Sequence, residues 1–197
     1  MNRLHAWYCN SEHWARTVEH DLLEWTLAHV SLGESLLELG AGAGTVTTHL
    51  RQRVARVTAV DVDTHALRRL RARTSVPLVS GGRIPTRVPA ATADAAALPF
   101  VNGAFTSVAA FTMVHHLPGL TRQRALLSEV WRVLLPGGSF AGCDALWTIG
   151  LRLFHLGDTF APVEPRQWKD ELEAVGFDVL DVSTMGRYLR WHARARG

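Results

Sequence analysis

Two carboxylates and a glycine-rich turn lie where they could recognise one ligand. Glu38 stands two residues before the segment 40–44, Gly-Ala-Gly-Ala-Gly, and Asp61 ends the next apolar stretch. A carboxylate attracts an ammonium group, and it can also accept both hydroxyls of a ribose. A third carboxylate, Asp94, could accept the exocyclic amine of an adenine. The spacing therefore predicts a ligand that carries an ammonium group, a ribose diol and an adenine.

The glycine turn argues against a dinucleotide. Alternate glycines let the backbone approach a ligand closely and offer N–H groups at a helix N-terminus. A dinucleotide fingerprint, however, needs a glycine where Thr45 stands, and Glu38 would repel a pyrophosphate. A nicotinamide-dependent reductase is the alternative, although it explains neither Glu38 nor Asp94. A purely structural turn, and a helix-capping role for Asp94, also stay open.

Two adjacent histidines are candidates for proton transfer. His115 and His116 follow a predicted strand whose end would face the ligand. A neutral imidazole is available near pH 7, so either side chain is a candidate base, with a structural role as the alternative. Other residues of types that can bind a metal are Cys9, His13 and His20. Their spacing is too loose to favour a metal ion, so we expect no metal site.

Strands and helices alternate along the chain and must position these residues. Ser11 is the expected N-cap of a helix that ends before Gly33. Further helices are expected after the glycine turn, over 64–73, from 121 to the Pro-Gly-Gly at 136–138, and over 165–175. Strands are expected at 35–39, 57–60, 105–111, 139–143, 177–182 and 189–195, with another either at 76–79 or just before Asp94. This alternation predicts a seven-stranded, doubly wound α/β sheet, mostly parallel, with a C-terminal antiparallel hairpin and helices on both faces.

Length and composition point to an ordinary globular chain. It has 197 residues, of which 47% are hydrophobic and 20% charged, which predicts one domain over 1–197 with residues 1–32 as a helical arm or lid. Two cysteines are too few for a disulfide framework, so we expect a cytoplasmic protein. The N-terminal residues lack an uninterrupted apolar core, and no stretch reaches the ~18 apolar residues of a membrane-spanning helix, so we expect neither a secretion signal nor a membrane span. The net charge of +3 is spread along the chain, which makes nucleic acid an unlikely partner. The arginines near the C-terminus are expected on an exposed strand edge.

An ordered set of motifs over residues 36–140 resembles the class I S-adenosylmethionine-dependent methyltransferases, in particular the small-molecule branch of the methyltransferase domain 11 kind. The motifs are E-L-G-A-G-A-G at 38–44, V-D-V-D at 60–63, D-A-A-A-L-P-F at 94–100, F-T-M-V-H-H-L at 111–117 and V-L-L-P-G-G at 133–138. The resemblance implies a Rossmann-like fold. One departure is the stretch 81–92, which looks longer than usual and resembles an insertion near the adenine pocket.

The resemblance also implies S-adenosylmethionine as the cofactor and a set of residues that bind it. Glu38 and the glycine turn would hold the methionine moiety, Asp61 the ribose, and Asp94 the adenine edge. The full set is Glu38, Gly40, Ala41, Gly42, Gly44, Asp61, Val62, Asp94, Ala95, Phe111 and Thr112. We therefore expect methyl transfer to a hydroxyl or amine, with a non-catalytic S-adenosylmethionine-binding protein as a further alternative.

Apolar segments at both ends of the chain predict where the methyl acceptor binds. The expected acceptor residues are Trp7, Tyr8, Trp14, Trp147 and Phe154. In open parallel sheets ligands lie outside the carboxyl ends of the strands, which these segments would enclose. An apolar or aromatic metabolite is the expected partner, because burial of an unpaired charge there is costly. Packing over the core or a homodimer contact is the alternative for these segments.

Overall fold

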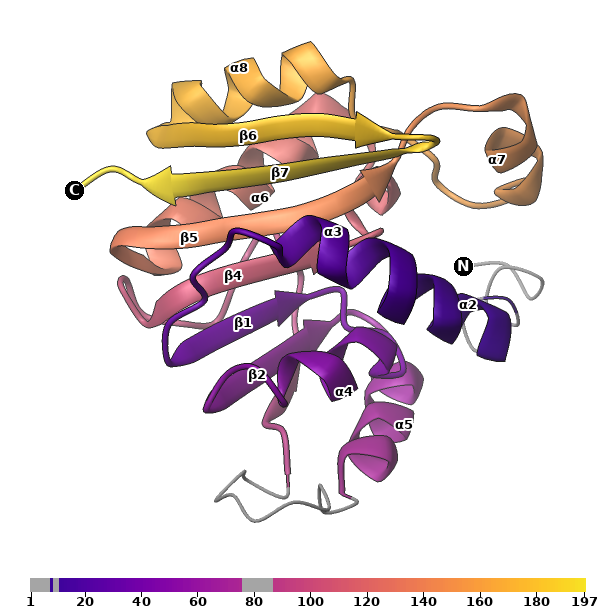
Figure 1. Cartoon of the computed structure of the whole chain (residues 1–197), viewed down its shortest axis with the longest axis horizontal. Helices are drawn as coiled ribbons and strands as arrows, with labels where there is room; N and C mark the ends of the chain where they lie inside the picture. The colour runs from indigo at the N-terminus through magenta and orange to yellow at the C-terminus, as the bar shows by residue number, and fades with distance from the viewer. Residues whose placement is uncertain (1–7, 9–10, 76–86) are drawn as a thin grey trace.

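The computed structural model describes residues 8, 11–75 and 87–197, and a single mixed sheet runs through its centre (Figure 1). Within the described residues this sheet has seven strands in the order β3-β2-β1-β4-β5-β7-β6. They are β1 (Ser35–Leu39), β2 (Arg56–Asp61), β3 (Ala90–Thr92), β4 (Phe105–Phe111), β5 (Leu134–Ala145), β6 (Phe177–Met185) and β7 (Tyr188–Ala195). Strands β1 to β5 are parallel, and β7 is antiparallel to both β5 and β6. The expected fold class is confirmed.

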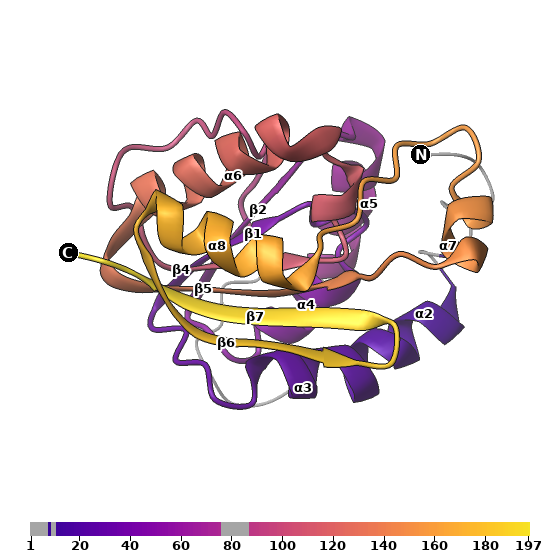
Figure 2. The ribbon, with the colours of Figure 1, turned by 90° about the horizontal axis from the view of Figure 1, so that it is seen from above.

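Helices cover both faces of the sheet (Figure 2). On one face lie α2 (Glu12–Arg16), the π-helical η1 (Thr17–Leu23), α3 (Glu24–Leu27), α4 (Thr45–Leu50) and α5 (Thr64–Thr74). On the other face lie α6 (Gly119–Val133) and α8 (Pro165–Val175). Two short elements, the 3₁₀ helix η2 (Val114–His116) and α7 (Ile149–Phe154), follow β4 and β5. Among the described residues, no helix is both long enough and apolar enough to cross a bilayer.

The central strands are apolar because both of their faces are buried. Successive side chains of a strand point to opposite faces, so Leu36 and Ala109 join the core under α4, while Leu37 and Val108 join the core under α6. All four side chains are fully buried. The sheet therefore packs against one apolar core on each face, and this packing holds the carboxyl ends of its strands in place.

The N-terminal helix begins as the sequence predicts. The Ser11 hydroxyl accepts a hydrogen bond from the backbone N–H of Trp14 at 3.1 Å, which is a typical N-cap. Trp14, Val18 and Leu22 are buried along one side of the helix, as expected from their spacing. The π-helical turns of η1 were not expected.

The structure settles one open expectation about local structure and corrects two others. The third strand is β3, which ends at Thr92, two residues before Asp94, so the last residues of the apparent insertion at 81–92 belong to the sheet, whereas 76–79 and 81–86 lie outside the described residues. Helix α6 ends at Val133, and the Pro-Gly-Gly at 136–138 lies inside β5 rather than ending the helix. The arginine-rich β7 is not an edge strand, because it pairs with β5 on one side and β6 on the other.

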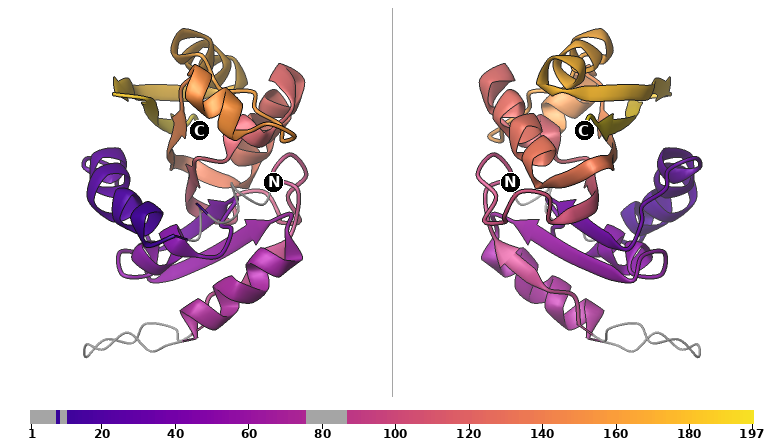
Figure 3. Two further views of the ribbon diagram at one scale, coloured as in Figure 1. Left: turned by 90° about the vertical axis from the view of Figure 1, so that its right-hand side faces the viewer. Right: turned by 90° about the vertical axis from the view of Figure 1, so that its left-hand side faces the viewer.

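The strand order creates a crevice at the carboxyl ends of β1 and β4. The chain leaves β1 toward the face covered by α4, and it leaves β4 toward the face covered by α6, so the two loops diverge. Open α/β sheets bind ligands at such a switch point. These strand ends point to the right in Figure 1, where α2 and α7 also lie, and the left view in Figure 3 looks at this side of the molecule.

Candidate active site

A cavity of about 600 Å³ opens at this switch point and collects the residues expected to bind the cofactor. Of the expected set, Glu38, Gly40, Ala41, Gly42, Asp61, Val62, Asp94, Ala95, Phe111 and Thr112 line this first cavity. Gly44 does not line it; its missing side chain instead leaves room for Leu70, whose Cγ would lie 2.9 Å from a Cβ at this position. The residues come from the carboxyl ends of β1, β2 and β4 and from the loops after β1, β2, β3 and β4, which the parallel sheet brings to one edge.

Glu38 is the most unusual carboxylate in the first cavity. It is only 2% exposed, and its Oε2 atom has no hydrogen-bond partner in the described structure. Burial raises the pKa of Glu38 to about 8, and the nearby charge of Asp61 adds to this effect. A buried polar atom without a partner is costly, so it favours a ligand that brings a donor. An ammonium group fits this position.

The backbone of the glycine turn is held close to Asp61. The amide of Gly42 donates to Asp61 Oδ2 at 2.7 Å, and the amide of Asp63 donates to Asp61 Oδ1 at 2.8 Å. Each carboxylate oxygen retains capacity for a second donor, such as a ribose hydroxyl. Gly40 has a φ of +64°, and a Cβ there would lie 2.6 Å from Met113 Cβ, so this position requires glycine.

Asp94 has local partners in addition to its place in the cavity. Its carboxylate accepts from the amide of Ala96 at 2.9 Å and pairs with Arg122 of α6. These hydrogen bonds hold the pKa of Asp94 below its ordinary value, so it stays ionised. The cavity position considered from the sequence is therefore present, whereas the helix-capping role is not, because a turn and not a helix follows Asp94.

A second cavity of about 290 Å³ adjoins the first. Trp14 and Thr112 line both cavities, and Thr112 has a φ of +49°, which is an outlier for a β-branched residue. Of the expected acceptor residues, Tyr8, Trp14 and Phe154 line the second cavity. Trp147 is 62% exposed and lines neither cavity, and Trp7 lies outside the described residues.

His115 and Asp144 form a buried pair on the wall of the second cavity. His115 is 3% exposed, and its Nδ1 is hydrogen-bonded to Asp144 Oδ1, while its backbone amide donates to Asp144 Oδ2 at 3.0 Å. Although burial opposes ionisation, the contact with His115 holds the pKa of Asp144 below its ordinary value. With Nδ1 engaged by the carboxylate, the lone pair of a neutral ring lies on Nε2, which has no hydrogen-bond partner in the described structure. Such a pair can accept a proton.

The structure adds residues that the sequence analysis missed. His155, Arg187 and Tyr188 line the second cavity, and none of them was expected there. Of the two histidines that were expected at the site, His115 lines the second cavity and His116 lines the first. Asp144 carried a weak signal, since it directly follows the predicted strand at 139–143. The others carried none, because they lie in segments whose distance from the sheet edge depends on the loop path.

Fold and site together define a class of protein: a doubly wound α/β protein with a carboxylate-lined cavity at the switch point of its sheet. The methyltransferase domain model matches residues 37–142. This match covers more than half of the chain, so the chain belongs to the class I S-adenosylmethionine-dependent methyltransferases. The family and the cofactor class expected from the sequence are confirmed.

Curated relatives are consistent with this family. An uncharacterized methyltransferase of Mycobacterium tuberculosis is 32% identical over 129 residues, which cover 65% of this chain and 58% of that protein. The chain thus spans somewhat more than half the length of this relative. A ubiquinone biosynthesis O-methyltransferase of Xanthomonas euvesicatoria is 28% identical over 192 residues, covering 88% of this chain and 75% of that protein.

A solved structure shares the fold over nearly the whole chain. The N-methyltransferase NodS of Bradyrhizobium japonicum, in complex with S-adenosyl-L-homocysteine, aligns with a TM-score of 0.73 and 18% identity. The alignment covers 97% of this chain and 92% of NodS. At this identity the likeness concerns the fold alone.

Proposed function

We propose that this protein transfers a methyl group from S-adenosylmethionine to a hydroxyl or amine of a small apolar or aromatic metabolite. The observation that carries this proposal is the junction of the two cavities at Trp14 and Thr112, with the His115–Asp144 pair on the wall of the second. A donor in the first cavity and an acceptor in the second would meet at this junction. Alignment of the two reactants supplies much of the catalysis in such a reaction.

The first cavity holds the cofactor in this proposal. Glu38 binds an ammonium group through its unpartnered Oε2, and Asp61 binds a ribose through oxygens already oriented by the glycine turn. Val62 and Ala95 pack against the base, and Asp94 lies at its edge. When bound, S-adenosylmethionine supplies an electrophilic methyl group on its sulfonium.

The second cavity holds the acceptor. Tyr8, Leu151 and Phe154 give it an aromatic and aliphatic wall, and Arg187 lies with its guanidinium 5.4 Å from the Tyr188 ring. We assign proton removal from the acceptor to Nε2 of His115, which Asp144 orients, with His116 as the other candidate. The relative from Xanthomonas euvesicatoria, named for O-methylation in ubiquinone biosynthesis, supports a hydroxyl as the group that accepts the methyl.

The N-terminal helices belong to the same proposal. Trp14 of α2 lines both cavities, and the Tyr8 ring lies 5.6 Å from the ring of Phe154 in α7. We propose that residues 1–32 act as an arm of a single domain over 1–197 and exclude water from the junction. Water exclusion strengthens electrostatic interactions in the site.

The test uses the full chain, S-adenosylmethionine labelled in its methyl group, and a panel of acceptors. The panel contains aromatic compounds with a hydroxyl or an amine. Each is tested with and without a carboxylate group, because a carboxylate could pair with Arg187 in the lining of the second cavity. We expect label in an aromatic acceptor and stoichiometric S-adenosylhomocysteine. Binding of S-adenosylhomocysteine without transfer to any acceptor would favour a non-catalytic binding protein, and oxidation of NADH would favour a reductase.

A further inference from the structure

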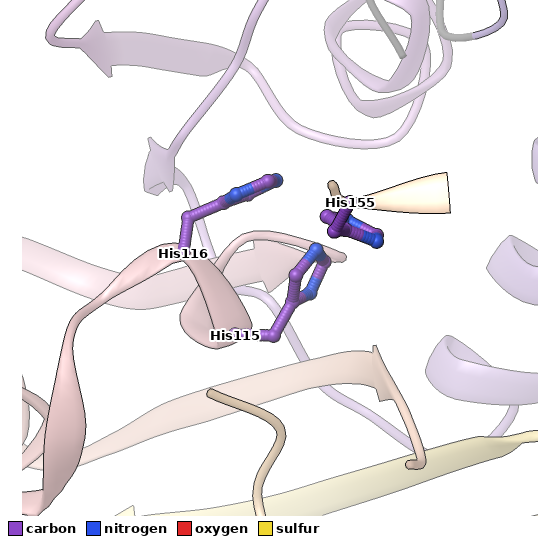
Figure 4. A group of neighbouring side chains, drawn as sticks. All are labelled: His115, His116 and His155. Carbon is purple, nitrogen blue, oxygen red and sulfur yellow. The ribbon is translucent and has the colours of Figure 1, made fainter. Parts of the chain in front are cut away.

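Three histidines from two separate parts of the chain come together where the two cavities meet. His115 and His116 belong to η2, and His155 directly follows α7 (Figure 4). One ring nitrogen from each lies within 4.8 Å of those of the other two. The ring centroids of His155 lie 5.1 Å from His115 and 5.5 Å from His116. Figure 4 shows the three imidazoles facing a shared space.

Hydrogen bonds orient two of these rings in the way that metal-binding histidines are oriented. Asp144 holds Nδ1 of His115, and the carbonyl of Leu151 accepts from Nδ1 of His155 at 2.7 Å. In both rings the lone pair is then on Nε2. Ligating histidines commonly donate their other N–H to a carboxylate or a backbone carbonyl, which fixes the tautomer and the ring orientation. The buried Nε2 of His115 has no hydrogen-bond partner in the described structure.

We propose that His115, His116 and His155 bind one divalent transition-metal ion, for which Zn²⁺ is the reference. Three imidazoles with one open position form a familiar zinc site, in which metal–nitrogen distances of about 2.0–2.1 Å place tetrahedral ligand nitrogens about 3.4 Å apart. In the structure the three ring nitrogens lie within 4.8 Å of one another, and small side-chain rotations would shorten these separations to about 3.4 Å. Hard ions such as Mg²⁺ prefer oxygen ligands and are not expected here.

The proposed ion lies between the two cavities, because His116 lines the first while His115 and His155 line the second. Its open position faces space available to a small ligand. A metal on Nε2 of His115 takes the lone pair that the proposed base would use. A protein that holds this ion therefore cannot use His115 as the base for methyl transfer. Metal binding is measured without a methyl acceptor, so its outcome can be told apart from the outcome of the methyl-transfer test.

The test is a titration of chelator-treated full-length protein with Zn²⁺ by calorimetry, and with Co²⁺ by visible absorption. We expect one equivalent of Zn²⁺ and the strong absorption of four-coordinate Co²⁺. His155→Gln and His116→Gln should each lower the Zn²⁺ affinity about 100-fold or more, and Asp144→Asn about 10- to 100-fold, because it orients a ligand. His29→Gln, an exposed histidine outside the cluster, is the matched control and should bind as the wild type does.

Two results would overturn the proposal. One is the absence of stoichiometric Zn²⁺ binding by the wild type. The other is wild-type affinity in both His116→Gln and His155→Gln, which would place the bound ion elsewhere. His116 is only half-buried, so its variant tests the site even if His155→Gln does not fold. Circular dichroism of every variant separates loss of metal from loss of structure.

Discussion

Glu38 links ligand binding to pH at the scale of a single residue. Its pKa of about 8 in the ligand-free protein means that the carboxyl is largely protonated at neutral pH. An ammonium group is bound by the carboxylate, so binding must displace this proton. We expect the affinity for S-adenosylhomocysteine to rise with pH by up to about tenfold per unit below pH 8 and then to level off.

Calorimetry between pH 6 and 9, in buffers of different ionisation enthalpy, measures both this affinity and the protons released. Glu38→Gln should bind weakly at every pH and release no proton from this position. Equal pH profiles for the wild type and Glu38→Gln would show that Glu38 is not the group that meets the ammonium.

Glu38 also affects stability, with the sign fixed by the raised pKa. Between the ordinary pKa of 4.5 and about 8, the folded ligand-free protein holds a proton that the unfolded chain releases. The free energy of unfolding should therefore fall as the pH rises through this range. Urea denaturation of the wild type and Glu38→Gln checks this, because the variant should lose that part of the pH dependence. A matching slope in both proteins would contradict it.

His115 carries a prediction about turnover. In metal-free protein with an authentic acceptor, His115→Asn should lower kcat by about 10²–10⁴ because it removes the proposed base. The affinity for S-adenosylhomocysteine should stay close to the wild-type value, since His115 does not line the first cavity. Wild-type turnover in both His115→Asn and His116→Asn would mean that alignment alone drives the reaction.

Packing between β4, β5 and β7 provides a prediction at the scale of elements. A Cβ at Gly142 of β5 would lie 2.2 Å from the carbonyl oxygen of Ala110 in β4 and 2.5 Å from Trp191 in β7. Neither backbone nor a fully buried tryptophan can yield easily. Gly142→Ala should therefore lower the free energy of unfolding by about 3 kcal/mol, the upper end for overpacking.

Urea denaturation measures this loss, and Gly150→Ala is its control. Gly150 lies in α7, and a Cβ there meets nothing within 4 Å, so alanine should be neutral or stabilise by up to about 1 kcal/mol. Wild-type stability of Gly142→Ala would show that the three strands can separate at no cost.

Ligand binding should stabilise the whole molecule. The first cavity is built by the ends of β1, β2 and β4 and by the loops that follow four strands, so a ligand bound there contacts segments distant in sequence. S-adenosylhomocysteine at 100 times its dissociation constant should raise the free energy of unfolding by about 2.7 kcal/mol. Thermal unfolding with S-adenosylhomocysteine and with NADH measures this. Stabilisation by NADH alone would contradict the ligand assignment.

Much of the fold follows from local pattern. The bounds of β1 and β4 match the expected ranges because strands buried on both faces are short, continuous apolar runs. The end of α6 was misplaced because Leu134 continues the apolar pattern, yet it pairs with Phe105 in the sheet. The edge position expected for β7 was wrong because its arginines do not face an open strand edge. Arg190 of β7 instead donates to Asp181 of the neighbouring strand β6.

The sequence by itself determined which residues line the first cavity, because they lie at the carboxyl ends of strands that a parallel sheet must align at one edge, or directly after them. Only the tertiary structure decided what surrounds the second cavity. The path of the chain through α7 brings His155, which follows it, to His115. The turn between β6 and β7 and the first residue of β7 bring Arg187 and Tyr188 to the cavity that Tyr8 also lines. These contacts join segments tens to more than a hundred residues apart in the chain. No local periodicity encodes such distances, since loop paths depend on packing against the finished sheet.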